Sequence, residues 1–158
     1  MKNNYFFYFF VLFFLFINKD ILFANELEIK SSKIKIEKKT KTVFLEGNVT
    51  AVDSKNNRIF SEAARYSKDK GLIETFGETK IITSEGYQII GENISFNNKE
   101  EIISSDNEKE ILDKDGNRIF VEMFNYIINK NMFLSKGRIE IKDINNNHYK
   151  FSEIYIDE

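Results

Sequence analysis

A repeated segment recurs about every thirty residues through most of this 158-residue chain. The nine residues 58–66 align without gaps with 88–96 and 118–126, a fourth copy follows at 149–155, and a degenerate half-copy covers 28–36. A fixed period of this length is typical of repeat architectures, in which each small unit buries its apolar face only by stacking on its neighbours.

Partner segments lie between these copies and keep the same period. Gly47, Gly77 and Gly137 mark three of them, and Asp106 takes the equivalent place in the other. Copies and partners alternate apolar and polar residues and are rich in Ile, Phe, Val and Tyr, which is typical of β-strands, while Gly, Asn and Asp in the connections indicate hairpin turns. The sequence therefore predicts an all-β, elongated and open structure of stacked two-strand repeats, with strands in two facing sheets.

The composition excludes several classes of function. The chain has no Cys, no Trp, no Pro, a single His at position 148, and a net charge of −2. Disulfides, cysteine zinc sites and thiol catalysis all need sulfur, and one His argues against a His-centred triad or a multi-His metal site. The balanced charge offers no field that would attract a polyanion. We therefore expect no enzyme activity, no catalytic residues, no metal, no cofactor and no nucleic-acid partner.

The first 24 residues have the pattern of an export signal. Lys2 precedes thirteen uncharged residues, 5–17, and Ala24 provides a small residue at the expected cleavage point. Thirteen residues are too few to span about 30 Å of hydrocarbon as a helix. We expect a signal peptide at 1–24 and an exported domain at 25–158, with an uncleaved anchor as the alternative.

One parity of the repeated strands is apolar in every copy, and the partner strands add to it. The candidate residues for the inward face are Val43, Leu45, Val49, Phe60, Ala64, Tyr66, Ile90, Ile94, Phe96, Phe120, Phe124, Tyr126, Phe133, Ile139, Phe151 and Tyr155. The stripe has two interpretations that the pattern leaves open. It forms a closed core, or the sheets splay apart and leave a groove of roughly 24 Å that accepts an extended apolar ligand such as an acyl chain.

The same parity carries one acid per repeat, at Glu62, Glu92, Glu122 and Glu153, with Ser32 in the degenerate copy. A ladder of ligands for a metal or for amines is one interpretation, but neighbouring carboxylates repel one another unless they are neutralised. We favour a structural one, in which a bulge turns each acid outward or the acid caps backbone donors at a corner of the sheet.

Three phrases resemble a known family. They are VFLEGNV at 43–49, FSEAARY at 60–66 and YSKDKG at 66–71. They are similar to the repeated unit of the OstA-like periplasmic domains of lipopolysaccharide transport, and the resemblance covers 27–157. It implies a β-jellyroll that carries lipopolysaccharide across the periplasm of a Gram-negative cell. It also implies that lipid A acyl chains occupy the apolar groove and that such domains join end to end through their edge strands.

Two kinds of family member differ in context. One is a stand-alone bridge protein, and the other is the outer-membrane assembly protein, in which this domain precedes a transmembrane barrel. The sequence stops at Glu158, in or just past a strand. We therefore expect the N-terminal domain of the barrel protein, truncated at its end, held at the outer membrane with a lipoprotein partner. The alternatives are the stand-alone bridge, an exported β-solenoid that acts on polysaccharide, and a structural repeat protein with a closed core.

Overall fold

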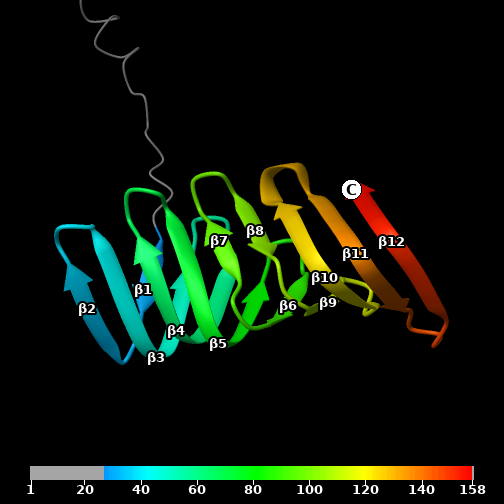
Figure 1. The fold of residues 1–158 in the computed structure, drawn as a ribbon, viewed down its shortest axis with the longest axis horizontal. Coiled ribbons are helices and arrows are strands. Elements are labelled where there is room, and N and C mark those ends of the chain that lie inside the picture. The colour runs from blue at the N-terminus through cyan, green and yellow to red at the C-terminus, as the bar shows by residue number, and fades with distance from the viewer. Residues whose placement is uncertain (1–26, 158) are drawn as a thin grey trace, which may run out of the picture.

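The computed structural model describes residues 27–157. The signal peptide expected at 1–24 lies outside the described residues. Within the described part, no helix is long and apolar enough to cross a membrane. Residues 27–157 form an all-β domain, as the alternating pattern predicts (Figure 1).

Twelve strands in residues 27–157 join one antiparallel sheet. They are β1 (Glu28–Lys30), β2 (Lys33–Glu37), β3 (Thr42–Val52), β4 (Arg58–Ser67), β5 (Leu72–Ile82), β6 (Gln88–Gly91), β7 (Ser95–Asn97), β8 (Ile102–Ser105), β9 (Lys109–Leu112), β10 (Arg118–Ile127), β11 (Met132–Lys142) and β12 (His148–Asp157), with a 3₁₀ turn, η1 (Ile128–Lys130). The repeated segments are β4, β6 with β7, β10 and β12, and their partners are β3, β5, β8 with β9, and β11.

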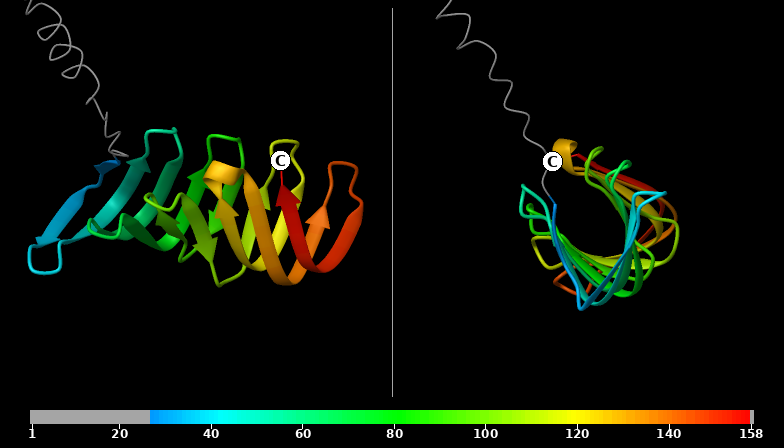
Figure 2. Two further views of the ribbon diagram at one scale, coloured as in Figure 1. Left: turned by 90° about the horizontal axis from the view of Figure 1, so that it is seen from above. Right: turned by 90° about the vertical axis from the view of Figure 1, so that its left-hand side faces the viewer.

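The sheet is folded lengthwise into two walls. One half of β3 pairs with β2 and the other half with β1, and in the same way β5 pairs with β7 and then with β6. The first wall contains β2, β7, β8 and the strand halves paired with them, and the second wall contains β1, β6, β9 and the other halves. Every long strand therefore runs from one wall into the other, and the end-on view shows a U-shaped trough (Figure 2). The two facing sheets expected from the sequence are therefore the two walls of one continuous sheet.

β-Bulges lie along the line of the fold. The register shifts between Glu46 and Val49 in β3, and β5 and β11 carry equivalent bulges opposite β4, β10 and β12. Gly47 has φ +73° at the first of these bulges, a left-handed conformation that glycine adopts at little cost. Because a bulge bends and twists its strand, a row of bulges folds the whole sheet along one line.

Two rows of turns form the free edges of the trough. We call the turns 38–41, 68–71, 98–101 and 128–131 the first rim, because they end the first wall, and the turns 53–57, 83–87, 113–117 and 143–147 the second rim. Three turns of the second rim share the pattern Asp-x-x-x-Asn. In the 53–57 turn, Asp53 accepts hydrogen bonds from the Asn57 main-chain and side-chain nitrogens at 2.8 and 2.6 Å. The aspartate carboxylates therefore stabilise the turns that contain them.

Candidate lipid-binding interior

The inner faces of the two walls meet in a continuous apolar interior. Its fully buried side chains include Leu45, Ile59, Ile73, Ile81, Ile89, Ile94, Phe96, Ile103, Ile111, Phe124, Tyr126 and Ile139. Ile81, Ile94, Ile103 and Ile139 have no exposed surface at all. The interior is therefore packed with the protein's own side chains. Of the two alternatives, a closed core and an open groove, the structure has the closed core.

Twelve of the sixteen candidate residues point into this interior or continue it at an end. They are Val43, Leu45, Val49, Ala64, Tyr66, Ile94, Phe96, Phe124, Tyr126, Phe133, Ile139 and Phe151. Phe124 and Phe133 stack at 5.8 Å between ring centroids, and the Tyr126 hydroxyl donates to the Asn131 side-chain oxygen at 2.8 Å. Burial raises the pKa of the Tyr66 hydroxyl above its usual value.

Four candidates face outward, and their expected inward placement is wrong. Phe60, Ile90 and Phe120 lie on the outer face of the second wall, and Tyr155 is 59% exposed on the outer face of the first. At each register shift, two residues of the partner strand lie opposite one residue of the repeated strand, and the repeated strand changes its inward parity there. In β4, for example, Ile59 and Ser61 are buried before the shift and Ala64 is buried after it. A single parity carried through the whole strand therefore selects the correct face on one wall only.

Sequence reasoning missed the inward residues of the second wall that neighbour these positions. Ile59, Ile89 and Ile119 are buried in the interior, where their neighbours Phe60, Ile90 and Phe120 had been expected. The glycines of the partner strands were the available signal, since a positive-φ glycine in a strand marks a bulge. Phe60 and Ile90 instead line an outer hollow of about 910 Å³.

In the described residues 27–157, an ion pair and a ring contact join the walls across the open side of the trough, which we call the seam. The Lys55 ammonium of the second rim lies 2.6 Å from the Glu101 carboxylate of the first rim. The Tyr87 ring, also on the second rim, packs against Tyr126 of the first wall at 5.4 Å between centroids. Entry into the interior from the side requires these contacts to separate.

Both ends of the trough expose apolar side chains that point inward. Ile34 and Ile36 of β2 face the same side as Leu45 and Val43, their register partners, yet Ile36 is 65% exposed. At the other end, Tyr149 and Phe151 of β12 continue the inner face and are each 45% exposed. The apolar interior therefore opens at both ends of the described domain.

The repeated acids lie on the outside of the fold line. Glu62 lies against the bulge at Gly77, and Glu122 lies against Gly137 in the same way. Glu153 forms an ion pair with Lys136 at 3.1 Å. No group of three or more acids or histidines in residues 27–157 is arranged to hold a metal ion.

In the third repeat, a lysine rather than a glutamate side chain lies against the glycine. The Lys109 stem lies against Gly91, and its ammonium donates to the carbonyl oxygens of Asn107 and Glu108 at 3.0 and 2.9 Å. Burial lowers the pKa of Lys109, while Glu92 and Glu108 oppose the shift. This lysine closes the gap between the separate strands β8 and β9, in the repeat where Asp106 stands in place of glycine.

The comparisons with known proteins point to one system. The model of a family described as lipopolysaccharide-assembly, LptC-related, matches residues 3–104. Among solved structures, LptH from Pseudomonas aeruginosa, described as the LptA-homologous periplasmic component of a lipopolysaccharide transport device, superimposes with a TM-score of 0.64. The alignment covers 80% of this chain and 94% of that one at 8% identity, which shows a shared fold. The search of curated proteins found no significant match.

Proposed function

Because the chain belongs to the LptC-related lipopolysaccharide-assembly family, we propose that it is a non-catalytic module that carries lipopolysaccharide through the periplasm. The acyl chains of the lipid would occupy the interior between the two walls, and the sugar headgroup would remain outside the seam. The observation that carries this proposal is the unbroken apolar inner face, which runs through every repeat and opens at both ends.

The packed interior sets a condition on this function. Acyl chains can enter only if the walls move apart, so that lipid replaces contacts that the walls make with each other. Because the acyl chains and the side chains of the walls are both apolar, the hydrophobic surface of the walls stays largely buried after the exchange. The costs include the seam contacts of Lys55 with Glu101 and of Tyr87 with Tyr126. Both are weak enough for a bound lipid to compensate.

The exposed ends suit an end-to-end array. A second jellyroll of the same kind, stacked on either end, would cover Ile36 or Phe151 and pair with the free edge of β2 or β12. Unpaired strand edges are ready templates for a further strand. We propose other jellyroll domains of the transport bridge as the protein partners, joined so that the apolar interior continues from one to the next.

The family match and the structural likeness support a bridge component better than the N-terminal domain of the outer-membrane barrel protein. The matched family model is LptC-related, and the solved structure is described as a periplasmic component. We therefore adopt the alternative that the sequence left open, a jellyroll component of the bridge. The lipoprotein partner of the barrel is no part of this proposal.

A reversible clamp across the seam tests the mechanism. The chain has no cysteine, so Lys55→Cys with Glu101→Cys gives two unique thiols on opposite rims. A bifunctional thiol reagent with a reducible spacer would tie the rims together. We expect the clamped protein to lose saturable binding of fluorescent lipopolysaccharide and to regain it when the spacer is reduced.

A matched clamp within one wall provides the control. Arg65 and Glu74 pair at 2.8 Å on the outer face of neighbouring strands β4 and β5. Arg65→Cys with Glu74→Cys, linked by the same reagent, should bind lipid as the unlinked protein does. Equal binding by the seam-clamped and reduced forms would exclude entry through the seam, and no binding by any form would exclude the lipid carrier itself.

A further inference from the structure

The two rims of the trough differ sharply in charge. The four turns of the first rim hold seven lysines and three acids, whereas the four turns of the second rim hold two lysines and five acids. We propose that the first rim is the binding surface for the anionic phosphate groups of the lipid headgroup. This inference rests on the proposed function, since it assigns the headgroup of the lipid whose chains enter the interior.

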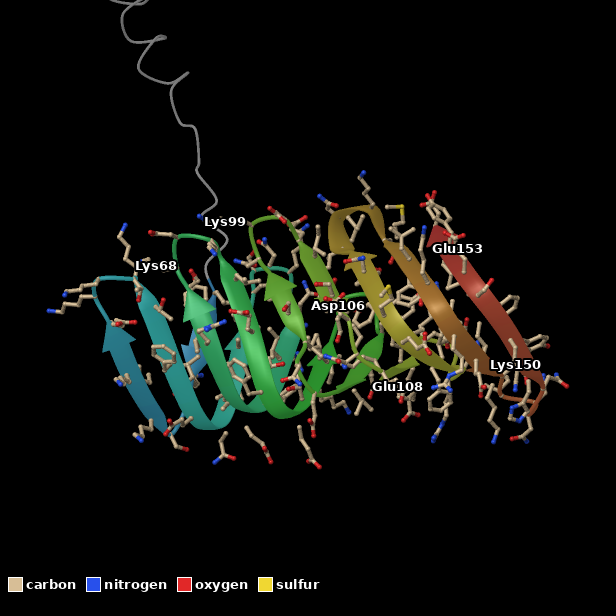
Figure 3. The ribbon with its side chains drawn as sticks, in the orientation of Figure 1. Lys68, Lys99, Asp106, Glu108, Lys150 and Glu153 are labelled. Atoms are coloured by element: carbon tan, nitrogen blue, oxygen red, sulfur yellow. The ribbon has the colours of Figure 1, made fainter. Side chains whose placement is uncertain are left out.

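The lysines gather at one end of this rim. The turn 38–41 contributes Lys38, Lys39 and Lys41, and the turn 68–71 contributes Lys68 and Lys70. Figure 3 shows Lys68 and Lys99 on neighbouring turns along the same edge of the trough. Neighbouring turns are two strands apart, or about 9.6 Å, so the lysines form a cationic row that follows the seam.

Main-chain hydrogen bonds fix the turns relative to one another. Lys68 N donates to Lys41 O at 3.3 Å, Asn98 N to Gly71 O at 2.9 Å, and Ile128 N to Glu101 O at 2.9 Å. The rim is therefore a continuous ladder rather than a set of independent loops. A row held in this way meets an anionic ligand without the entropy cost of ordering its backbone first.

Most of these lysines are available for a ligand. Asp69 already engages two cations, because its carboxylate pairs with Lys41 at 3.2 Å and its carbonyl accepts from Lys99 at 2.6 Å. Within residues 27–157, five rim lysines make no ion pair. They are Lys38, Lys39, Lys68, Lys70 and Lys130.

The opposite rim directs the headgroup toward the lysines. Its carboxylates at Asp53, Asp113 and Asp143 each accept a hydrogen bond from a main-chain nitrogen of their own turn, which holds these acids on the second rim. An amphiphile with its chains in the interior must place its headgroup at the seam, between the two rims. Attraction on one side and repulsion on the other would draw a phosphate over the lysine row.

Binding by a rim variant tests this assignment. Lys38, Lys39, Lys68 and Lys70, all changed to Gln, remove four charges from the row. A control variant changes Lys35, Lys80, Lys142 and Lys150 to Gln, which removes four charges from the outer faces of the walls. The probes are lipopolysaccharide, the same preparation with its phosphates removed, and vesicles containing phosphatidylglycerol.

We expect the rim variant to bind lipopolysaccharide about tenfold more weakly than the control variant at low salt, and the two to converge in 1 M salt, where the screening length is about 3 Å. Dephosphorylated lipid should bind both variants equally. Equal loss in both variants, or an equal rim effect with dephosphorylated lipid, overturns the inference and leaves the carrier function standing. A rim effect confined to vesicles overturns it in favour of a membrane contact, and failure of the unmodified protein to bind either lipid overturns both proposals.

Discussion

The Glu122 carboxylate reaches across the fold line and accepts a hydrogen bond from the Arg138 main-chain nitrogen at 3.0 Å, beside the bulge at Gly137. Glu62 occupies the same position against Gly77. The acid that recurs in the repeats therefore covers the glycine bulge of the following strand. For Glu62 and Glu122, this geometry agrees with the structural interpretation of the repeated acids.

Gly137→Ala should lower the free energy of unfolding by about 1–2 kcal/mol, because φ at this position is +96° and an L side chain is strained there. The added Cβ would also meet the Glu122 carboxylate. Urea denaturation of the variant and the unmodified protein measures the difference. An unchanged unfolding free energy would show that the bulge relaxes without cost and does not hold the fold line.

Phe124→Ala and Phe120→Ala should differ widely in stability, although the two positions are only four residues apart on the same strand, β10. Phe124 is 2% exposed in the interior and Phe120 is 41% exposed on the outer face. We expect losses of about 3–5 kcal/mol and under about 1 kcal/mol respectively. Equal losses in urea denaturation would mean that the two faces of β10 are assigned wrongly.

The same strand shows what the sequence could and could not predict. The thirty-residue period, the alternation and the turn residues are local, so the strands and their stacking followed from them. The facing of Phe124 followed too, because it lies beyond the bulge on the wall where the assumed parity holds. Phe120 lies before the bulge, and the bulge is created by a glycine on the neighbouring strand, Gly137, which a reading along β10 alone does not contain.

The seam contacts could not be predicted from the sequence. Lys55 and Glu101 are far apart in the sequence, on turns of different repeats and opposite walls. Their contact depends on how far the folded sheet curls, which is a property of the whole array. The lysine row of the first rim, in contrast, can be read from the sequence once the turns are assigned to rims.

Lys55→Gln should speed the uptake of lipopolysaccharide a few-fold, because it removes the ion pair that joins the rims. Stability should change by less than about 1 kcal/mol, since both groups are partly exposed and screened. Stopped-flow mixing with fluorescent lipopolysaccharide measures the rate. Arg65→Gln, which removes an ion pair within one wall, is the control, and equal acceleration by both variants would argue against a role for the seam pair.

Acid should loosen the 143–147 turn at a pH set by Asp143. Hydrogen bonds from the Asn147 side chain, then from the Asn147 and Asn145 main chain, hold the pKa of Asp143 below its ordinary value. Since the folded pKa is depressed, the carboxylate stabilises the fold fully above the ordinary value of about 3.9 and loses that effect as the pH falls through the folded pKa.

Asp143→Ala should therefore melt at a lower temperature than the unmodified protein at pH 7, and the difference should shrink as the pH falls below about 4. Thermal unfolding followed by circular dichroism across this range measures both curves. A difference that stays constant with pH would assign the effect to the loss of the side chain itself rather than to its charge.

Photo-crosslinking in cells that make lipopolysaccharide tests most directly whether lipid occupies the interior. A photoreactive phenylalanine analogue is placed at Phe124, on the inner face, or at Phe120, on the outer face of the same strand. The account predicts lipopolysaccharide adducts at Phe124, and at Phe96 as a second inward position, with none at Phe120. Adducts at Phe120 alone, or at none of the inward positions, would contradict it.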